Sequence, residues 1–146
     1  MPITINGSGT LTGISAGGLP DGCVTGDDIA NSTVTATKLG TTEQSRLCRA
    51  WVNFDGTGTV AIRASYNVSS ITDNGVGDYT INFAAAMPDA NYSFSLSGRA
   101  QSSGVSTGMV FNQHFDTSPS SSAIRITSTQ GGSFADISII SVAIFR

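Results

Sequence analysis

Charged residues are scarce in this chain, and their scarcity excludes one class of partner. Only 12% of the 146 residues are charged, against about a quarter in an ordinary globular domain. The 7 basic residues are scattered and leave a formal net charge of −3, whereas a nucleic-acid site needs clustered lysine and arginine. The sequence therefore predicts no nucleic-acid partner. Its neutral surface, rich in serine and threonine, favours packing against other proteins.

Groups suited to catalysis are equally few. His114 is the only histidine and Glu43 the only glutamate, so the sequence does not favour a nucleophilic hydrolase. Most aspartates fall in turn contexts, where the side chain bonds the nearby backbone. Residues 72–78 have the oxygen ligands and glycine of a calcium loop but lack its later glutamate, so we interpret them as a turn. We expect no enzyme, no cofactor and no metal site, and we place His114 on the surface or at a subunit interface.

Long apolar runs and secretory features are also missing. No apolar stretch approaches the roughly 20 residues that cross a bilayer, and the first residues lack the basic and apolar regions of a signal peptide. The two cysteines, Cys23 and Cys48, match no common zinc or redox spacing. We therefore expect a soluble product made in a cytoplasm, without membrane insertion. Reduced thiols are the expected state, with a disulfide as the alternative.

Aromatic residues are absent before Trp51, and this divides the chain in two. We predict an extended N-terminal arm over residues 1–45 and a β-sandwich domain over residues 46–146. An arm without aromatic bulk has too little apolar surface for a core of its own. Something else must therefore cover it.

A ten-residue repeat is visible in the arm. Val24-Thr25 and Ile29-Ala30 in the first copy correspond to Val34-Thr35 and Leu39-Gly40 in the second. Units this short cannot bury their apolar faces alone, so the repeat predicts contact with neighbouring chains or a partner surface. With only two copies, a chance match is the alternative.

After residue 46 the sequence is dominated by alternation of apolar and polar residues, which is typical of half-buried strands. Residues 41–49 allow at most one short helical turn. Turns are expected at 55–58, at 72–77 as a longer Asn-Gly loop, and at 87–90. The last strand, within 135–145, is apolar on both faces, which places it centrally in a sandwich or against another subunit.

About eight short strands separated by turns predict an all-β, antiparallel β-sandwich of jelly-roll type. A partner subunit would supply further cover for the last strand. The side chains expected to fill the sandwich are Trp51, Phe54, Tyr79, Phe83, Tyr92, Phe94 and Phe111.

Four segments between Arg49 and Tyr92 carry a resemblance to a known family. They read W-V-N-F-x-G-T-G-T from Trp51, I-R-A-S-Y-N-V-S-S-I-T-D-N-G from Ile62, G-D-Y-T-I-N-F from Gly77 and M-P-D-A-N-Y from Met87. In this order they resemble a module of bacteriophage tail-fibre and virion-surface proteins. Residues 1–22, MPITINGSGTLTGISAGGLPDG, also resemble the start of fibre and decoration proteins, especially those of cyanobacterial phages. The resemblance implies a virion structural protein, usually a homotrimer.

Two functions remain open on these grounds. The first is a trimeric capsid decoration (cement) protein that reinforces the outer capsid surface, with the major capsid protein or another virion protein as partner and the host surface as a further contact. A flexible arm that orders on contact buries much surface per residue, which suits such a clamp. The arm residues expected to contact the capsid or a sister subunit are Ile3, Ile5, Leu11, Ile14, Leu19, Val24, Ile29, Val34 and Leu39.

The second function is a short tail fibre or fibre tip that binds host surface glycans. Its contacts would come from two polar loops, at residues 98–108 and 116–122. Sugar sites usually display exposed aromatic side chains, and these loops contain none. The loop residues expected to meet a receptor are Arg99, Gln101, Ser103, Ser118 and Ser120.

Overall fold

The computed structural model describes residues 24–44, 46–99 and 109–146. The chain separates into two units, Met1–Leu39 and Gly40–Arg146. In the described part of the first unit the backbone forms two short 3-10 helices, η1 (Gly26–Asp28) and η2 (Ala36–Lys38). The second unit begins with α1 (Thr41–Gln44), which confirms the short helical turn expected there.

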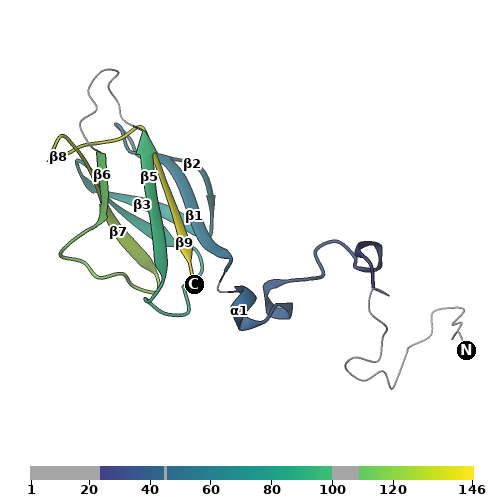
Figure 1. The fold of residues 1–146 in the computed structure, drawn as a ribbon. Helices are drawn as coiled ribbons and strands as arrows, with labels where there is room; N and C mark the ends of the chain where they lie inside the picture. The colour runs from purple at the N-terminus through teal and green to yellow at the C-terminus, as the bar shows by residue number, and fades with distance from the viewer. Residues whose placement is uncertain (1–23, 45, 100–108) are drawn as a thin grey trace, which may run out of the picture. The chain divides into compact units, whose positions relative to one another are not determined.

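Two antiparallel sheets make up the rest of the described chain (Figure 1). One has the strand order β2-β1-β9-β5, and the other has the order β3-β4-β7-β6, with β8 paired to β7. This confirms the all-β, antiparallel class. The strands are β1 (Cys48–Asp55), β2 (Ala61–Tyr66), β3 (Val68–Gly75), β4 (Asp78–Phe83), β5 (Ser93–Arg99), β6 (Met109–Gln113), β7 (Ala123–Gln130), β8 (Ser133–Phe134) and β9 (Ile139–Phe145).

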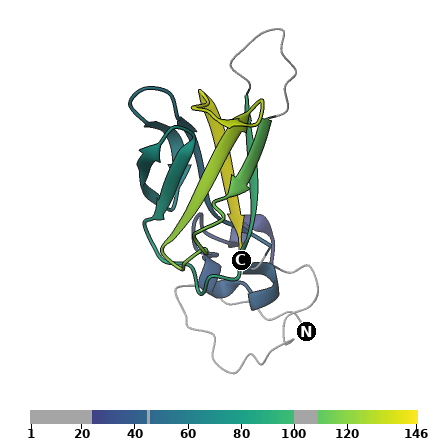
Figure 2. The same ribbon diagram turned by 90° about the vertical axis from the view of Figure 1, so that its left-hand side faces the viewer.

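The hydrophobic core is built from alternate residues of both sheets, because every second side chain of a strand points to the same face. Figure 2 shows β7 (yellow-green) and β9 (yellow), which belong to different sheets, crossing in projection. The rings of Phe54 and Tyr79, one from each sheet, meet edge to face with centroids 5.2 Å apart. The buried core residues are Ala50, Val52, Phe54, Tyr79, Ile81, Phe83, Met87, Tyr92, Ile124, Ile126, Ile137, Ile140, Val142 and Ile144.

The last strand, β9, lies between β1 and β5 (Figure 1). Its inner face, which carries Ile140, Val142 and Ile144, is buried in the core. Its outer face is only half-buried at Ile139 and Ala143. The strand is therefore central in its sheet, with one face in the core and the other half-buried.

The prediction that Trp51 fills the sandwich is wrong. Its side chain is 40% exposed, whereas Phe54 on the same strand is fully buried. The two residues are three apart, and an odd spacing on a strand puts side chains on opposite faces. Phe94 and Phe111, also expected in the core, are half-buried and pack against its margin.

Two further expectations differ from the structure. The segment 72–77 is not a long loop: β3 continues to Gly75 and a tight hairpin leads into β4 at Asp78. The left-handed backbone that this turn requires is supplied by Gly77, with φ of 65°. The other difference is β2, whose six residues are all exposed rather than alternating, because none of its side chains belongs to the core or packs against it.

Candidate functional site

The ten-residue repeat of the arm has a structural counterpart. The helices η1 and η2 begin at Gly26 and Ala36, ten residues apart. In each copy the threonine before the helix accepts a backbone bond through its carbonyl oxygen: Asp28 N to Thr25 O is 3.1 Å, and Lys38 N to Thr35 O is 2.9 Å. Both copies therefore adopt the same local turn, which argues against a chance match of letters.

Apolar side chains of this repeat face solvent in the single chain. Val24 is 53% exposed, Val34 56% and Ile29 42%, while Leu39 is half-buried. The first turn is fixed by its own polar groups, since Thr25 donates to Asp28 Oδ2 from both its backbone nitrogen (2.8 Å) and its hydroxyl (2.7 Å). These bonds lower the pKa of Asp28, the backbone bond being the main cause. The apolar side chains of the repeat are thus exposed at a regular interval along the arm. The arm residues Ile3, Ile5, Leu11, Ile14 and Leu19 lie outside the described part of the chain.

A shallow depression of about 230 Å³ lies on the outer face of the sheet β2-β1-β9-β5. The register explains its shape. Trp51 on β1 is level with Ala143 on β9 and Ser95 on β5, and Asn53 is level with Ser141 and Ser97. Small side chains on the central strand thus leave a hollow between a tryptophan and a row of serines. We call this surface the Trp51 face; its lining residues are Trp51, Val52, Asn53, Ser95, Ser97, Ser141, Val142 and Ala143.

The predicted receptor loops are placed only in part. Arg99 is the exposed last residue of β5, and Ser118 is exposed in the loop between β6 and β7. Ser120 is engaged locally: its hydroxyl accepts bonds from the backbone nitrogens of Ser122 (3.3 Å) and Ala123 (3.0 Å). Ser120 therefore shapes the loop. Gln101 and Ser103 lie outside the described residues.

The charged group on the other sheet is an ion pair with a histidine beside it. Arg125 donates to both carboxylate oxygens of Asp78, at 2.8 and 2.5 Å, and these bonds are the main reason that the pKa of Asp78 is lowered. His114 Nε2 lies 3.8 Å from Asp78 Oδ2, and His114 Nδ1 accepts from the backbone nitrogen of Asp116. His114 is only 9% exposed, so a surface position is wrong, since Phe115 stacks on the ring; the alternative, a subunit interface, stays a prediction. The ion pair thus links the neighbouring strands β4 and β7.

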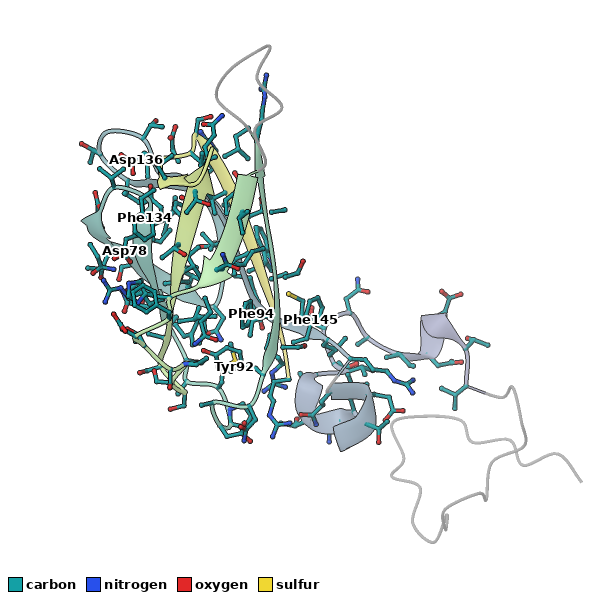
Figure 3. All side chains as sticks on the ribbon, turned by 60° about the vertical axis from the view of Figure 1, so that its left-hand side comes forward. Asp78, Tyr92, Phe94, Phe134, Asp136 and Phe145 are labelled. Atoms are coloured by element: carbon teal, nitrogen blue, oxygen red, sulfur yellow. The ribbon has the colours of Figure 1, made fainter. Side chains whose placement is uncertain are left out.

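A second polar group joins three segments at one end of the sandwich, where Figure 3 labels Asp136. The hydroxyl of the buried Tyr79 lies 2.8 Å from Asp136 Oδ1 and 3.0 Å from the carbonyl oxygen of Gly56. Burial first, and then the bond to Asp136, raises the pKa of Tyr79. The backbone nitrogen of Gly77 donates to the same Asp136 oxygen at 2.7 Å. These contacts fix turns rather than expose a reactive group.

Neither metal ligation nor membrane insertion is supported by the described residues. Among them, no three histidine, cysteine, aspartate or glutamate side chains gather closely enough to hold a metal ion. No helix in the described ranges has the length and apolarity needed to cross a membrane. Cys48 is a free, half-buried thiol that donates to the carbonyl oxygen of Ala50, and Cys23 lies outside the described ranges.

No protein-family model, no curated protein and no solved structure matches the chain.

The Trp51 face was missed in the sequence, although a signal for it exists. Ala50, Val52 and Phe54 form one alternating apolar series, so Trp51, Asn53 and Asp55 must occupy the opposite face of β1. A tryptophan on the polar face of a strand is the observation that could have located the surface. The serines of β5 add a second signal, because Ser93, Ser95 and Ser97 alternate with Phe94 and Leu96.

Proposed function

We propose that this chain is a virion structural protein, a homotrimeric capsid decoration protein that is assembled in the host cytoplasm and attached through its N-terminal arm. The observation that carries the proposal is the repeated turn at η1 and η2, which presents Val24, Ile29 and Val34 to solvent. A regular row of exposed apolar side chains marks a protein contact. The motif resemblance to phage virion proteins supports the same class.

Within this proposal the two parts of the arm have different partners. Val24, Ile29, Val34 and Leu39 line a three-fold contact among sister arms, because equivalent side chains from three chains would cover one another around an axis. Ile3, Ile5, Leu11, Ile14 and Leu19 bind the major capsid protein or a neighbouring protomer. The sandwich then stands on the capsid surface as a rigid head.

The jelly-roll relationship of the sandwich is part of the proposal. It is supported by the adjacency of β1 and β9, the first and last strands, in one antiparallel sheet. The role is structural and not catalytic: the ion pair at Asp78 and the bonded hydroxyl of Tyr79 both serve packing.

The function is tested by the copy number of the chain in purified virions, measured by quantitative mass spectrometry relative to the major capsid protein. A ratio comparable to that of the capsid subunit is expected for a decoration protein. A count as low as that of tail components would overturn this assignment. It would favour the second candidate, a short tail fibre or fibre tip, which the same motif resemblance supports.

The three-fold arm contact is tested separately with the double variant Val24→Ser/Val34→Ser. We expect a trimer for the native chain and a monomer for the variant, by size-exclusion chromatography with light scattering, because the variant loses both exposed valines of the repeat. Val110→Ser, at a valine that is 47% exposed on the sandwich, is the matched control and should stay trimeric. A trimer that survives the double substitution would place the subunit contact elsewhere.

A further inference from the structure

The Trp51 face has the shape of a site for one ring. Its hollow of about 230 Å³ is smaller than the roughly 300–1,000 Å³ of pockets for drug-sized molecules. One wall is the indole of Trp51, which is 40% exposed, and the floor is the short side chains of Ala143 and Ser141. A single ring of modest size therefore fits it best.

The polar groups around the hollow are neutral and have bonding capacity to spare. Asn53 Nδ2 donates to Ser141 Oγ at 2.8 Å, so the hydroxyl hydrogen of Ser141 and the amide oxygen of Asn53 remain to bond a ligand. Ser95 and Ser97 are exposed on the opposite wall, and each can donate and accept. Paired donors and acceptors without charge match the hydroxyls of a sugar.

Composition also favours a small ligand over a second copy of the chain. Protein interfaces are enriched in tryptophan, tyrosine and arginine but depleted in serine. This face combines one tryptophan with Ser95, Ser97 and Ser141, and its central strand contributes only the short side chains of Ser141 and Ala143. Such a surface offers hydrogen-bonding groups in a hollow, but it lacks the large side chains that would pack into a partner protein.

We infer that the Trp51 face binds a neutral pyranose ring of a surface polysaccharide, which stacks on Trp51 while its hydroxyls bond Asn53, Ser141 and Ser97. The face is open along the sheet, so the glycan chain can continue beyond the bound ring. This site differs from the loops in which receptor contacts were expected, and it does not depend on how the arm attaches the protein.

The test uses the full chain and three soluble probes: methyl β-D-glucopyranoside, methyl β-D-galactopyranoside and methyl α-D-mannopyranoside. The chain has 1 tryptophan, so its fluorescence reports on this site alone. At least one probe should shift the emission, with a Kd of about 1 mM, in the range expected for a dozen ligand atoms. The same probe should give saturation-transfer NMR signals from its ring protons.

Variants separate this site from others. Trp51→Ala should weaken binding at least about tenfold, corresponding to about 1.4 kcal/mol, as measured by the NMR signals. Ser97→Leu should also weaken binding, because the larger side chain fills the hollow from the edge strand β5. This variant leaves the core unchanged, so it still tests the site if Trp51→Ala fails to fold. Phe134→Ala, at an aromatic side chain that is 51% exposed on β8 (Figure 3), should bind like the native chain.

Three results would overturn the inference. One is the absence of any fluorescence or NMR response with all three probes. Another is undiminished binding in both Trp51→Ala and Ser97→Leu. The third is a change of oligomeric state in Trp51→Ala, measured by light scattering, which would show that a second copy of the chain covers the face. The arm contact is tested independently by the Val24→Ser/Val34→Ser variant.

Discussion

At the scale of single residues, Tyr79 joins three segments that are distant in sequence. Its ring is fully buried against Phe54, and its hydroxyl reaches the turn at Gly56 and the carboxylate of Asp136. Tyr92 has a similar place at the other end of the core, with its hydroxyl 3.1 Å from the carbonyl oxygens of Ser120 and Ala123. Both rings therefore combine packing with the closure of loops.

Alkaline pH should reveal these two tyrosines. Burial raises the pKa of Tyr92 to about 12 and raises that of Tyr79 further. The folded state therefore holds protons that the unfolded state loses near pH 10, so this stability is complete below pH 10 and declines as the pH rises above it. Between pH 10 and about 12 we expect the free energy of unfolding to fall by about 1.4 kcal/mol per pH unit for each tyrosine.

The variant Tyr79→Phe isolates one of them. It should lose about 1–2 kcal/mol at neutral pH, because Gly56 and Asp136 lose a hydrogen-bond donor, and it should show about half the native slope above pH 10. Urea unfolding at several pH values measures both effects. Tyr66→Phe, at a ring that is 59% exposed, should retain the native slope. A native slope in Tyr79→Phe would contradict the account.

Two aspartate–arginine pairs of similar geometry should contribute differently to stability. The side chain of Asp78 is 15% exposed and that of its partner Arg125 30%, whereas Asp89 and Arg146 are 38% and 39% exposed. We expect Asp78→Asn to cost about 1–2 kcal/mol at neutral pH. Asp89→Asn should cost clearly less, because solvent screens its pair.

The pH dependence of the first variant follows from the lowered pKa of Asp78. The charged carboxylate is favoured by folding, so its contribution is present above the ordinary value of 3.8 and is lost as the pH falls below it through the folded-state pKa. The difference between native chain and Asp78→Asn should therefore shrink below about pH 4, as urea unfolding would show. A difference that stays constant into strong acid would mean that the ion pair is not its source.

At the scale of elements, the hairpin between β3 and β4 contains two glycines with positive φ, Gly75 and Gly77, and Gly77 is the one in close contact with other backbone. A Cβ at Gly77 would lie 2.4 Å from the carbonyl oxygen of Ser128 and 2.7 Å from the backbone nitrogen of Ala135. Gly58 has a similar left-handed φ, 61° against 65°, but open space around it. We expect Gly58→Ala to cost about 1 kcal/mol for its backbone alone. Gly77→Ala should cost at least about 2 kcal/mol more, because backbone atoms must move. Thermal unfolding of both variants measures the difference, and equal losses would exclude the close contact as the cause.

The elements also show what the sequence could predict. Alternation placed Phe54, Tyr79 and Phe83 correctly, because period two follows directly from strand geometry. It failed at β2, because whether a strand packs on the core depends on the tertiary arrangement, which local sequence does not encode. The arm repeat was visible in the sequence. The Trp51 face was not, since it needs β1, β9 and β5 in register, with Asn53 and Ser141 separated by 88 positions in sequence.

At the scale of the whole molecule, the two units should be separable. Residues 40–146 contain all the strands of the described chain and its core, so a protein lacking residues 1–39 should melt within a few degrees of the native chain but be monomeric.

Deletion of residues 1–19 alone should leave a folded trimer that no longer binds capsids. Calorimetry, light scattering and capsid pull-down measure these outcomes. Retained capsid binding after the shorter deletion would contradict the arm model.

The central place of β9 also determines when the sandwich can form during synthesis. β1 and β5 are translated early, but the strand that joins them, Ile139–Phe145, is translated last among the strands. Until it leaves the ribosome, β1 and β5 lack their common neighbour, and unpaired strand edges invite association between nascent chains. This sheet can therefore be completed only after translation of β9, whose contacts with β1 are distant in sequence.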